Sequence, residues 1–252
     1  MTAAVAVTPS IQERTGADER ELAFADFHCH TRHSRDSRLT EERFVELALE
    51  RGLTHVAVTD HDTIEGSVAV RRRAQELGLA DRLTVILAEE VSSADGEIVG
   101  LFIDETVPSG LSAEDTADAI RDQGGFVSVP HPFDPFRRSH LREEALERMA
   151  TTGRIDAVEV FNSRVTFDRH NQQAADFAAR HGIPGVAVSD SHTALEVAMS
   201  FNALPAFSNA DELRAALPRN EWHGSRTTKL VHLGTRWAIA SKWIGRRAGR
   251  DR

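Results

Sequence analysis

The side chains in this chain that could hold metal ions lie in short groups, each directly after a stretch that predicts a β-strand. Those groups are His28 and His30; Asp60, His61 and Asp62; Glu89 and Glu90; His131; Asn162; and Asp190 and His192. In an extended segment His28 and His30 point to the same side, as two ligands of one ion require, whereas Cys29 points away as a small buried filler. Imidazoles mixed with carboxylates suit Mn, Fe or Zn. Eight or more candidates exceed the needs of one ion, so we expect at least two ions that share a bridging carboxylate.

Each group taken alone has an ordinary structural explanation. Asp60 could cap the next helix, and His131 lies between two prolines in what could be a stiff loop. Glu89 and Glu90 could be surface acids. All the groups would have to be ordinary at once, whereas a parallel barrel brings the carboxyl ends of its strands to one face, where active sites are built. The distribution therefore predicts a metal site at one end of a barrel.

The elements that must position these residues alternate along the chain. Strands are predicted at 23–27, 55–58, 83–88, 97–103, 126–129, 156–161 and 185–188, and helices from Thr40 to Gly52 and near 64–78, 112–123, 142–151, 168–181 and 210–217. Strand-then-helix alternation indicates parallel strands with crossover helices. One link differs, because Asp95-Gly96 favours a turn between two adjacent strands. We therefore expect an α/β fold, a distorted (β/α) barrel of about seven strands.

Composition narrows the class of protein. The chain has 252 residues, 40% of them hydrophobic, with 30 Lys and Arg against 39 Asp and Glu. It can bury a full core, and its net charge of −9 argues against a general nucleic-acid coat. A single cysteine excludes an internal disulfide framework. No apolar run approaches the roughly 20 residues of a membrane span, and the first residues lack a secretory signal, so we expect a cytoplasmic protein.

The two ends of the chain differ from its body. We expect a flexible leader over residues 1–22, a single compact domain over 23–224, and a basic tail over 225–252 with eight Lys or Arg against one Asp. The favoured interpretation of the tail is a helix that packs Trp237 and Trp243 onto the body. The alternative is an amphipathic helix that binds a partner or a membrane surface.

Six motifs run in order over about residues 23–210. They are Asp26-Phe-His28-Cys-His30-Thr31, Ser34-x-Asp36, Thr59-Asp60-His61-Asp62-Thr63, Glu90-Val-Ser92, Pro130-His131-Pro132 and Ser189-Asp190-Ser-His192-Thr193. This pattern resembles the PHP family, the polymerase and histidinol phosphatase superfamily of metal-dependent phosphoesterases. The resemblance implies a distorted seven-stranded (β/α) barrel with two or three divalent metal ions, Mn, Fe or Zn.

The resemblance also implies a set of ligands. The first metal would be held by His28, His30, Glu90 and Asp190, the second by Glu90 and His131, and the third by Asp36, His61 and His192. Glu90 is preferred to Glu89 for its spacing to Ser92. Many relatives have a histidine ligand of the second metal where this chain has Glu97, which can still ligate, so the identity of that metal stays open.

The implied reaction is hydrolysis of a phosphate ester, in which a hydroxide bridging two metals attacks phosphorus. The expected catalytic residues are Asp60, His61 and His192, with Asp60 orienting a ligand imidazole or relaying a proton. Arginine side chains can donate paired hydrogen bonds to phosphate oxygens, which points to Arg137, Arg138 and Arg164 as substrate-binding residues. Asn162, which follows a predicted strand, is expected to bind substrate as well.

The expected substrate is a small phosphorylated compound, such as histidinol phosphate, a nucleotide, a short nucleic acid or another small phosphodiester. Only 40 residues separate Glu90 from His131, which leaves no room for a large cap domain. Two other classes stay open: a metal-dependent hydrolase of C–N or C–O bonds on a similar barrel, and a non-catalytic metal-stabilised module that acts through its basic tail.

Overall fold

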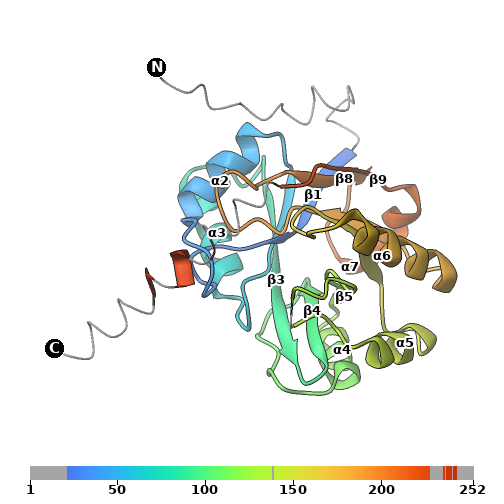
Figure 1. The fold of residues 1–252 in the computed structure, drawn as a ribbon. Coiled ribbons are helices and arrows are strands. Elements are labelled where there is room, and N and C mark those ends of the chain that lie inside the picture. Colours follow the sequence, from blue (N-terminus) through green and yellow to red (C-terminus); the bar gives the residue numbers. More distant parts are fainter. Residues whose placement is uncertain (1–21, 138, 228–234, 236, 240, 243–252) are drawn as a thin grey trace, which may run out of the picture.

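The computed structural model describes residues 22–137, 139–227, 235, 237–239 and 241–242 (Figure 1). Apart from Leu22, the predicted leader lies outside the described residues, as do Arg138 and much of the predicted tail. The strands are β1 (Leu22–Cys29), β2 (His55–Val58), β3 (Thr84–Ser93), β4 (Gly96–Leu101), β5 (Phe126–Val129), β6 (Ala157–Asn162), β7 (Gly185–Val188), β8 (Ser200–Pro205) and β9 (Glu221–Gly224). The helices are α2 (Glu41–Glu50), α3 (Glu65–Glu76), α4 (Ala113–Asp122), α5 (Glu143–Thr151), α6 (Asp168–His181), α7 (Ala210–Ala216) and the 3-10 helix η1 (Leu217–Arg219).

The strands form one curved sheet in the order β7-β6-β5-β4-β3-β2-β1-β8-β9, and helices α2 to α6 surround it (Figure 1). Strands β1 to β3 are parallel, as are β5 to β7, whereas β4, β8 and β9 pair antiparallel. The sheet nearly closes, because the Asn202 side chain of β8 donates to Ala187 O of β7 (2.7 Å) and to Ala25 O of β1 (3.1 Å). The predicted distorted (β/α) barrel is confirmed, with two strands, β8 and β9, that were not predicted.

The predicted turn at Asp95-Gly96 joins β3 and β4 as an antiparallel hairpin, in which Ser93 pairs with Gly96. Gly96 has a φ of +135°, and a Cβ there would lie 2.5 Å from Leu141 Cα, so a side chain cannot fit. Strand β3 is longer than predicted. Glu89 and Glu90 therefore lie within the strand, not after it.

The barrel interior is packed at one end and polar at the other. Small apolar side chains such as Ala25 and Ala57 fill it, together with Leu213 and Leu217 of α7 and η1. Arg214 of α7 donates to Gly125 O (2.6 Å), just before β5, so this helix closes the end where the parallel strands begin. The opposite end, where the parallel strands finish, holds the candidate metal ligands. No helix in the described ranges is long and apolar enough to cross a membrane.

Candidate metal centre

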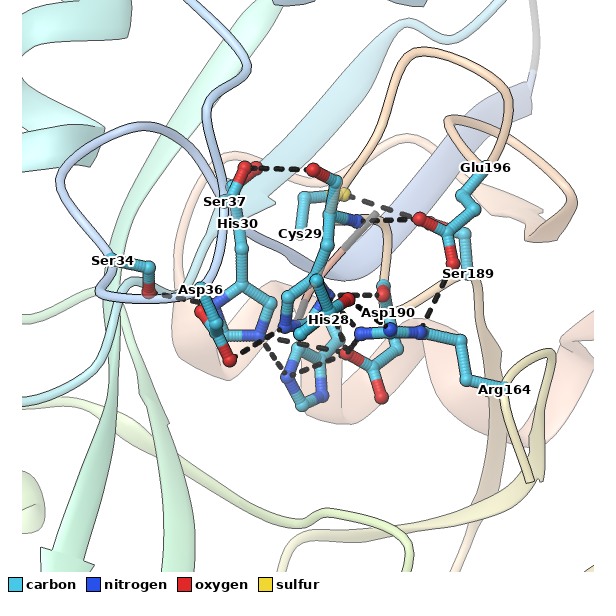
Figure 2. A network of polar contacts seen from close by, with 12 residues as sticks. His28, Cys29, His30, Ser34, Asp36, Ser37, Arg164, Ser189, Asp190 and Glu196 are labelled. Carbon is cyan, nitrogen blue, oxygen red and sulfur yellow. Dashed lines mark hydrogen bonds and ion pairs between the residues drawn. The ribbon is translucent and has the colours of Figure 1, made fainter. Parts of the chain in front are cut away.

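A β-bulge in β1 turns two histidines into the barrel. Phe27 packs in the interior core. Asp26 pairs with Val56 and Cys29 with Val58, so β1 has one residue more than β2 between these two pairs. The extra residue forms the bulge and reverses which side chains of β1 face the interior. His28 and His30 therefore face inward, with their Nε2 atoms 3.0 Å apart, and Cys29 enters the outer core (Figure 2). The structure thus places Cys29 away from both imidazoles, as the alternation predicts.

Strand β3 separates its two adjacent glutamates. Ile86 and Ala88 face the interior, and Glu90 shares their side of the strand. Its Oε2 lies 3.4 Å from Nε2 of both His28 and His30, and its Oε1 lies 3.2 Å from His131 Nε2. Glu90 is therefore placed to bridge two ions. Glu89 points the other way and accepts a hydrogen bond from the backbone N–H of Val107.

The structure brings together all the predicted metal ligands. Ligand atoms within 4.8 Å of one another form four overlapping groups: His28, His30 and Glu90; His28, His131 and Asp190; His61, Glu90 and Glu97; and His30, Asp36, His61 and His192. The last group has Asp36 Oδ2 3.1 Å from His192 Nε2 and 3.4 Å from His61 Nε2. The nine residues lie in β1, β3 and β4 and in the loops that follow β1, β2, β5 and β7, which explains why they are scattered through the sequence.

Buried atoms without hydrogen bonds show that this donor set fits cations. Glu90 Oε2, Asp190 Oδ1 and Asp36 Oδ1 are buried and accept no hydrogen bond within the described part of the chain. A buried carboxylate oxygen without a donor is costly unless a cation neutralises it. Because these oxygens lie among imidazole nitrogens, divalent ions that accept both donor types would satisfy them. The donor set therefore fits divalent metal ions.

The pKa values of the cluster differ sharply between neighbours. Burial lowers the pKa of His28, but the charges of Glu159, Glu90 and Asp190 outweigh it and raise that pKa well above its usual range. Burial and the charge of His192 lower the pKa of His30 to about 3. His30 is therefore neutral, whereas His28 holds a proton until a cation replaces it, so metal binding should release protons.

Glu159 supports two of the ligands and was missed in the sequence. Its carboxylate accepts from His28 Nδ1 (2.6 Å) and from the backbone N–H of His131 (2.9 Å). The first hydrogen bond leaves His28 Nε2 free to bind a metal. The available signal was a charged residue in the middle of an otherwise apolar strand, the segment AVEVF within β6.

Asn162 positions two carboxylates of the site and is not among the residues that line the cavity, so its contact with substrate stays a prediction. A bulge between Glu159 and Phe161 turns Asn162 to the same side as Glu159. Asn162 is fully buried, and its amide donates to Glu159 Oε2 (2.9 Å) and Asp190 Oδ2 (3.0 Å). These contacts fix the two carboxylates relative to each other.

Asp60, which was predicted to orient a ligand imidazole or relay a proton, contacts the loop after β1 and not an imidazole directly. Its carboxylate accepts from Thr31 N (2.7 Å), Thr31 Oγ1 (2.5 Å) and Ser34 N (3.1 Å). Ser34 Oγ in turn lies 3.0 Å from His30 Nδ1 and accepts from His61 N (3.0 Å). Asp60 therefore acts on both histidines through Ser34.

Replacing Gly66 by alanine should disturb this support. An added Cβ would lie 1.7 Å from Asp60 Oδ2 and 2.9 Å from Thr31 Oγ1, so the buried carboxylate must move. We expect Gly66→Ala to lower the free energy of unfolding by about 1–3 kcal/mol and to weaken metal binding. Urea unfolding and metal titration would measure both. Glu65→Ala, at the neighbouring exposed position, should stay within about 0.5 kcal/mol of the native protein, and equal losses in the two variants would contradict the argument.

Two of the proposed ligands have left-handed backbones. His131 has a φ of 29° and Asp190 a φ of 52°, which non-glycine residues rarely adopt. The surrounding contacts hold both residues there: His131 N–H donates to Glu159, and Asp190 accepts from Asn162 and Arg137. Strained residues of this kind concentrate at functional sites.

A cavity of about 410 Å³ opens beside Asp36, His61, Glu97 and His192 and is lined by three arginines, Arg35, Arg137 and Arg164. Arg137 pairs with Asp190, and Arg164 pairs with Glu196 (3.0 Å). Burial alone would lower the pKa of Arg137, but the charges of Asp190 and Glu90 outweigh burial and raise that pKa above its usual value. Arg137 therefore stays charged. Arg138, also predicted to bind substrate, lies outside the described residues. Arg35 was missed, although it occupies the middle of the Ser34-x-Asp36 motif.

The described residues of the tail lie against this site. Thr235 lines the cavity and accepts from Arg164 (2.6 Å), and Lys242 donates to Arg32 O (2.7 Å) in the loop that carries Asp36. Trp237 is 68% exposed, so the favoured expectation that it packs onto the body is wrong. Ala238, which is 3% exposed, faces the body in its place. Trp243 lies outside the described residues.

Comparison with known proteins agrees with this geometry. An uncharacterized protein of Methanocaldococcus jannaschii is 34% identical over 149 residues, which is 55% of this chain and 81% of that protein. A 5′–3′ exoribonuclease of Escherichia coli is 36% identical over 36% of this chain, and the match spans 32% of the exoribonuclease. A solved two-domain protein of Bacteroides vulgatus, containing a predicted PHP-like metal-dependent phosphoesterase, has the same fold. Its TM-score is 0.66 at 18% identity, over 82% of this chain and 66% of that one.

Two family models cover most of the barrel. The model of the PHP domain matches residues 26–153, which include the ligand motifs from β1 to β5. The model of the PHP-associated region matches residues 168–221. The chain therefore belongs to the PHP domain family, the family of metal-dependent phosphoesterases that its sequence motifs resemble.

Proposed function

We propose that this protein hydrolyses a phosphate ester in a small phosphorylated substrate with the help of two or three divalent metal ions. The observation that carries the proposal is one cavity in which three arginines lie beside Asp36, His61, Glu97 and His192, which belong to two of the four overlapping ligand groups. Arginine guanidinium groups recognise phosphate oxygens by paired hydrogen bonds. Bound divalent metals supply an activated water at neutral pH and neutralise charge on the phosphoryl group.

The chain's own residues divide the work. His28, His30, Glu90 and Asp190 would hold one ion, Glu90 with His131 and Glu97 a second, and Asp36, His61 and His192 a third. Glu159 and Asp60 keep the imidazoles in position. Among the carboxylates proposed as ligands, Glu97 is the one that protonates most readily, because burial and the charge of Glu90 raise its pKa to about 7. A protonated Glu97 would leave the second site short of one negative ligand.

Arg164 is suited to substrate through its contact with His192. His192 Nδ1 lies 2.9 Å from Asp190 O and 2.5 Å from Arg164 Nη1. A carbonyl oxygen only accepts, so the tautomer that leaves His192 Nε2 free for a metal carries its proton on Nδ1 and donates to Asp190. Arg164 Nη1 then has no acceptor on that ring, and Arg164 lines the cavity, where its N–H groups could donate hydrogen bonds to a phosphate oxygen.

The substrate class that we propose is a nucleotide, the end of a short nucleic acid or a small phosphomonoester. The exoribonuclease of E. coli shares about a third of its length with this chain, which supports a nucleic-acid end. The proposal is tested by three assays, each with Mn²⁺ and with chelator. They measure phosphate release from mononucleotides and small phosphomonoesters, phosphate or mononucleotide release from 5′-phosphorylated oligonucleotides, and hydrolysis of amide substrates. Hydrolysis of amides alone would overturn it.

Arg35 offers a clean variant for the same test, because it is exposed and lines the cavity. We expect Arg35→Ala to lower kcat/KM for a phosphate ester by about 10- to 100-fold, since one hydrogen bond to a charged group is lost. The bound metal per chain should not change. Arg43→Ala removes an exposed arginine paired with Glu46 on α2 and should leave kcat/KM unchanged. Equal rates for native protein and Arg35→Ala would exclude Arg35 from phosphate binding.

A further inference from the structure

An exposed aromatic side chain stands in the wall of the same cavity. Phe136 is 64% exposed, although a phenyl ring of this size is usually buried. It lines the cavity next to Arg137, and its backbone N–H donates to Asp134 Oδ1 (3.1 Å), which fixes the loop. Packing of the protein core therefore does not account for a ring at this position.

Phe136 contacts a second aromatic ring, that of Phe167. Its centroid lies 5.8 Å from that of Phe167, with the ring planes at 45°. The guanidinium carbon of Arg169 lies 4.9 Å from the Phe167 centroid, and His170 meets the same ring edge-on at 6.0 Å. Phe167, which is 38% exposed, is thus held by side chains at the start of α6 and supports Phe136.

The rest of the cavity restricts what can lie on this ring. Its wall includes Asp36, Asp134, Ser139 and Thr166, which disfavour an extended apolar chain. A flat aromatic group needs one apolar face and tolerates polar groups at its edges, as nucleobases do when they stack on aromatic side chains. The three arginines of the cavity supply the charge for a phosphate attached to such a group.

We propose that Phe136 is a stacking platform for the nucleobase of a nucleoside phosphate whose phosphate group is bound by Arg35, Arg137 and Arg164. This inference rests on the proposed function and specifies its substrate class, because it makes the base, and not only the phosphate, a recognised part of the substrate. The base contact requires no particular hydrogen-bonding edge, so the platform should accept purines and pyrimidines alike.

The test compares two ligands that differ only in the base. The methylenephosphonate analogues of adenosine 5′-monophosphate and of ribose 5-phosphate cannot be hydrolysed, and calorimetry on the Mn²⁺-loaded protein gives their Kd values. We expect the adenosine compound to bind about 5- to 100-fold more tightly, the range for one stacked base. In Phe136→Leu, which keeps an apolar side chain without the aromatic face, this ratio should fall towards one.

Trp222→Leu is the matched control. Trp222 is also exposed and stacked, on Phe161 at 5.6 Å, but it lies on β9 and does not line the cavity. Its loss should leave the ratio of Kd values unchanged. Equal affinities of the two analogues in the native protein, or an unchanged ratio in Phe136→Leu, would overturn the platform even if phosphate esters are hydrolysed. A base-dependent ratio without hydrolysis of any phosphate ester would support the platform and overturn the proposed function alone.

Discussion

Replacing Glu90 by glutamine should remove at least one metal ion per chain and lower kcat/KM for a phosphate ester by about 10³-fold. Glu90 is the carboxylate whose two oxygens face different ligand groups, with His28 and His30 on one side and His131 on the other. Glutamine keeps the size but loses the charge, so the two groups are no longer joined by a shared anion. Metal analysis of the purified protein and steady-state kinetics would measure the two effects.

Glu89→Gln is the control for that experiment. Glu89 is as fully buried as Glu90 and adjacent to it, but its carboxylate lies on the opposite side of β3. Burial raises its pKa to about 7, so the protein already accommodates the uncharged form of Glu89 in part of the molecules at neutral pH. We expect native metal content and native kinetics. If Glu89→Gln and Glu90→Gln lost metal equally, the assignment of the bridging carboxylate to Glu90 would be wrong.

Glu159→Gln should weaken metal binding by about 10- to 100-fold, although Glu159 is not itself a proposed ligand. Its two oxygens accept hydrogen bonds from His28 Nδ1, His131 N and Asn162 Nδ2. A glutamine has one oxygen for these donors. If its amide faces His28, the ring must carry its proton on Nε2, the atom that would bind the metal. If it faces His131, two N–H groups oppose each other.

Calorimetric titration of the metal-free protein with Mn²⁺ would measure this change in metal affinity. Asp156→Asn serves as the comparison, since Asp156 directly precedes the same strand and lies at the opposite end of the barrel, where it pairs with Arg121 and Arg214. We expect Asp156→Asn to lower stability and leave metal affinity unchanged. Native affinity in Glu159→Gln would show that the ligands need no support from Glu159.

Most of the nine proposed ligands were recognisable in the sequence because they follow a predicted strand with a strong local pattern, whereas Asp36 and Glu97 were indicated only by the resemblance to the PHP family. The hairpin between β3 and β4 was equally local, since Asp95-Gly96 supplies the turn. Glu90 shares the parity of Ile86 and Ala88, which face the interior. Side chains alternate with a period of two in any uninterrupted strand, so local sequence carries this information without knowledge of the partner strand.

Tertiary structure decided which residues support the ligands and how the barrel closes. Simple alternation from Phe27 would have sent His28 outward, but a bulge against β2 reverses it, and a second bulge brings Asn162 beside Glu159. Closure depends on Asn202 of β8, a strand without a recognised pattern. A bulge depends on how two strands pair, and a buried carboxylate such as Glu159 needs hydrogen-bond donors from distant parts of the chain. Neither feature is a property of one segment, so both depend on the packed barrel.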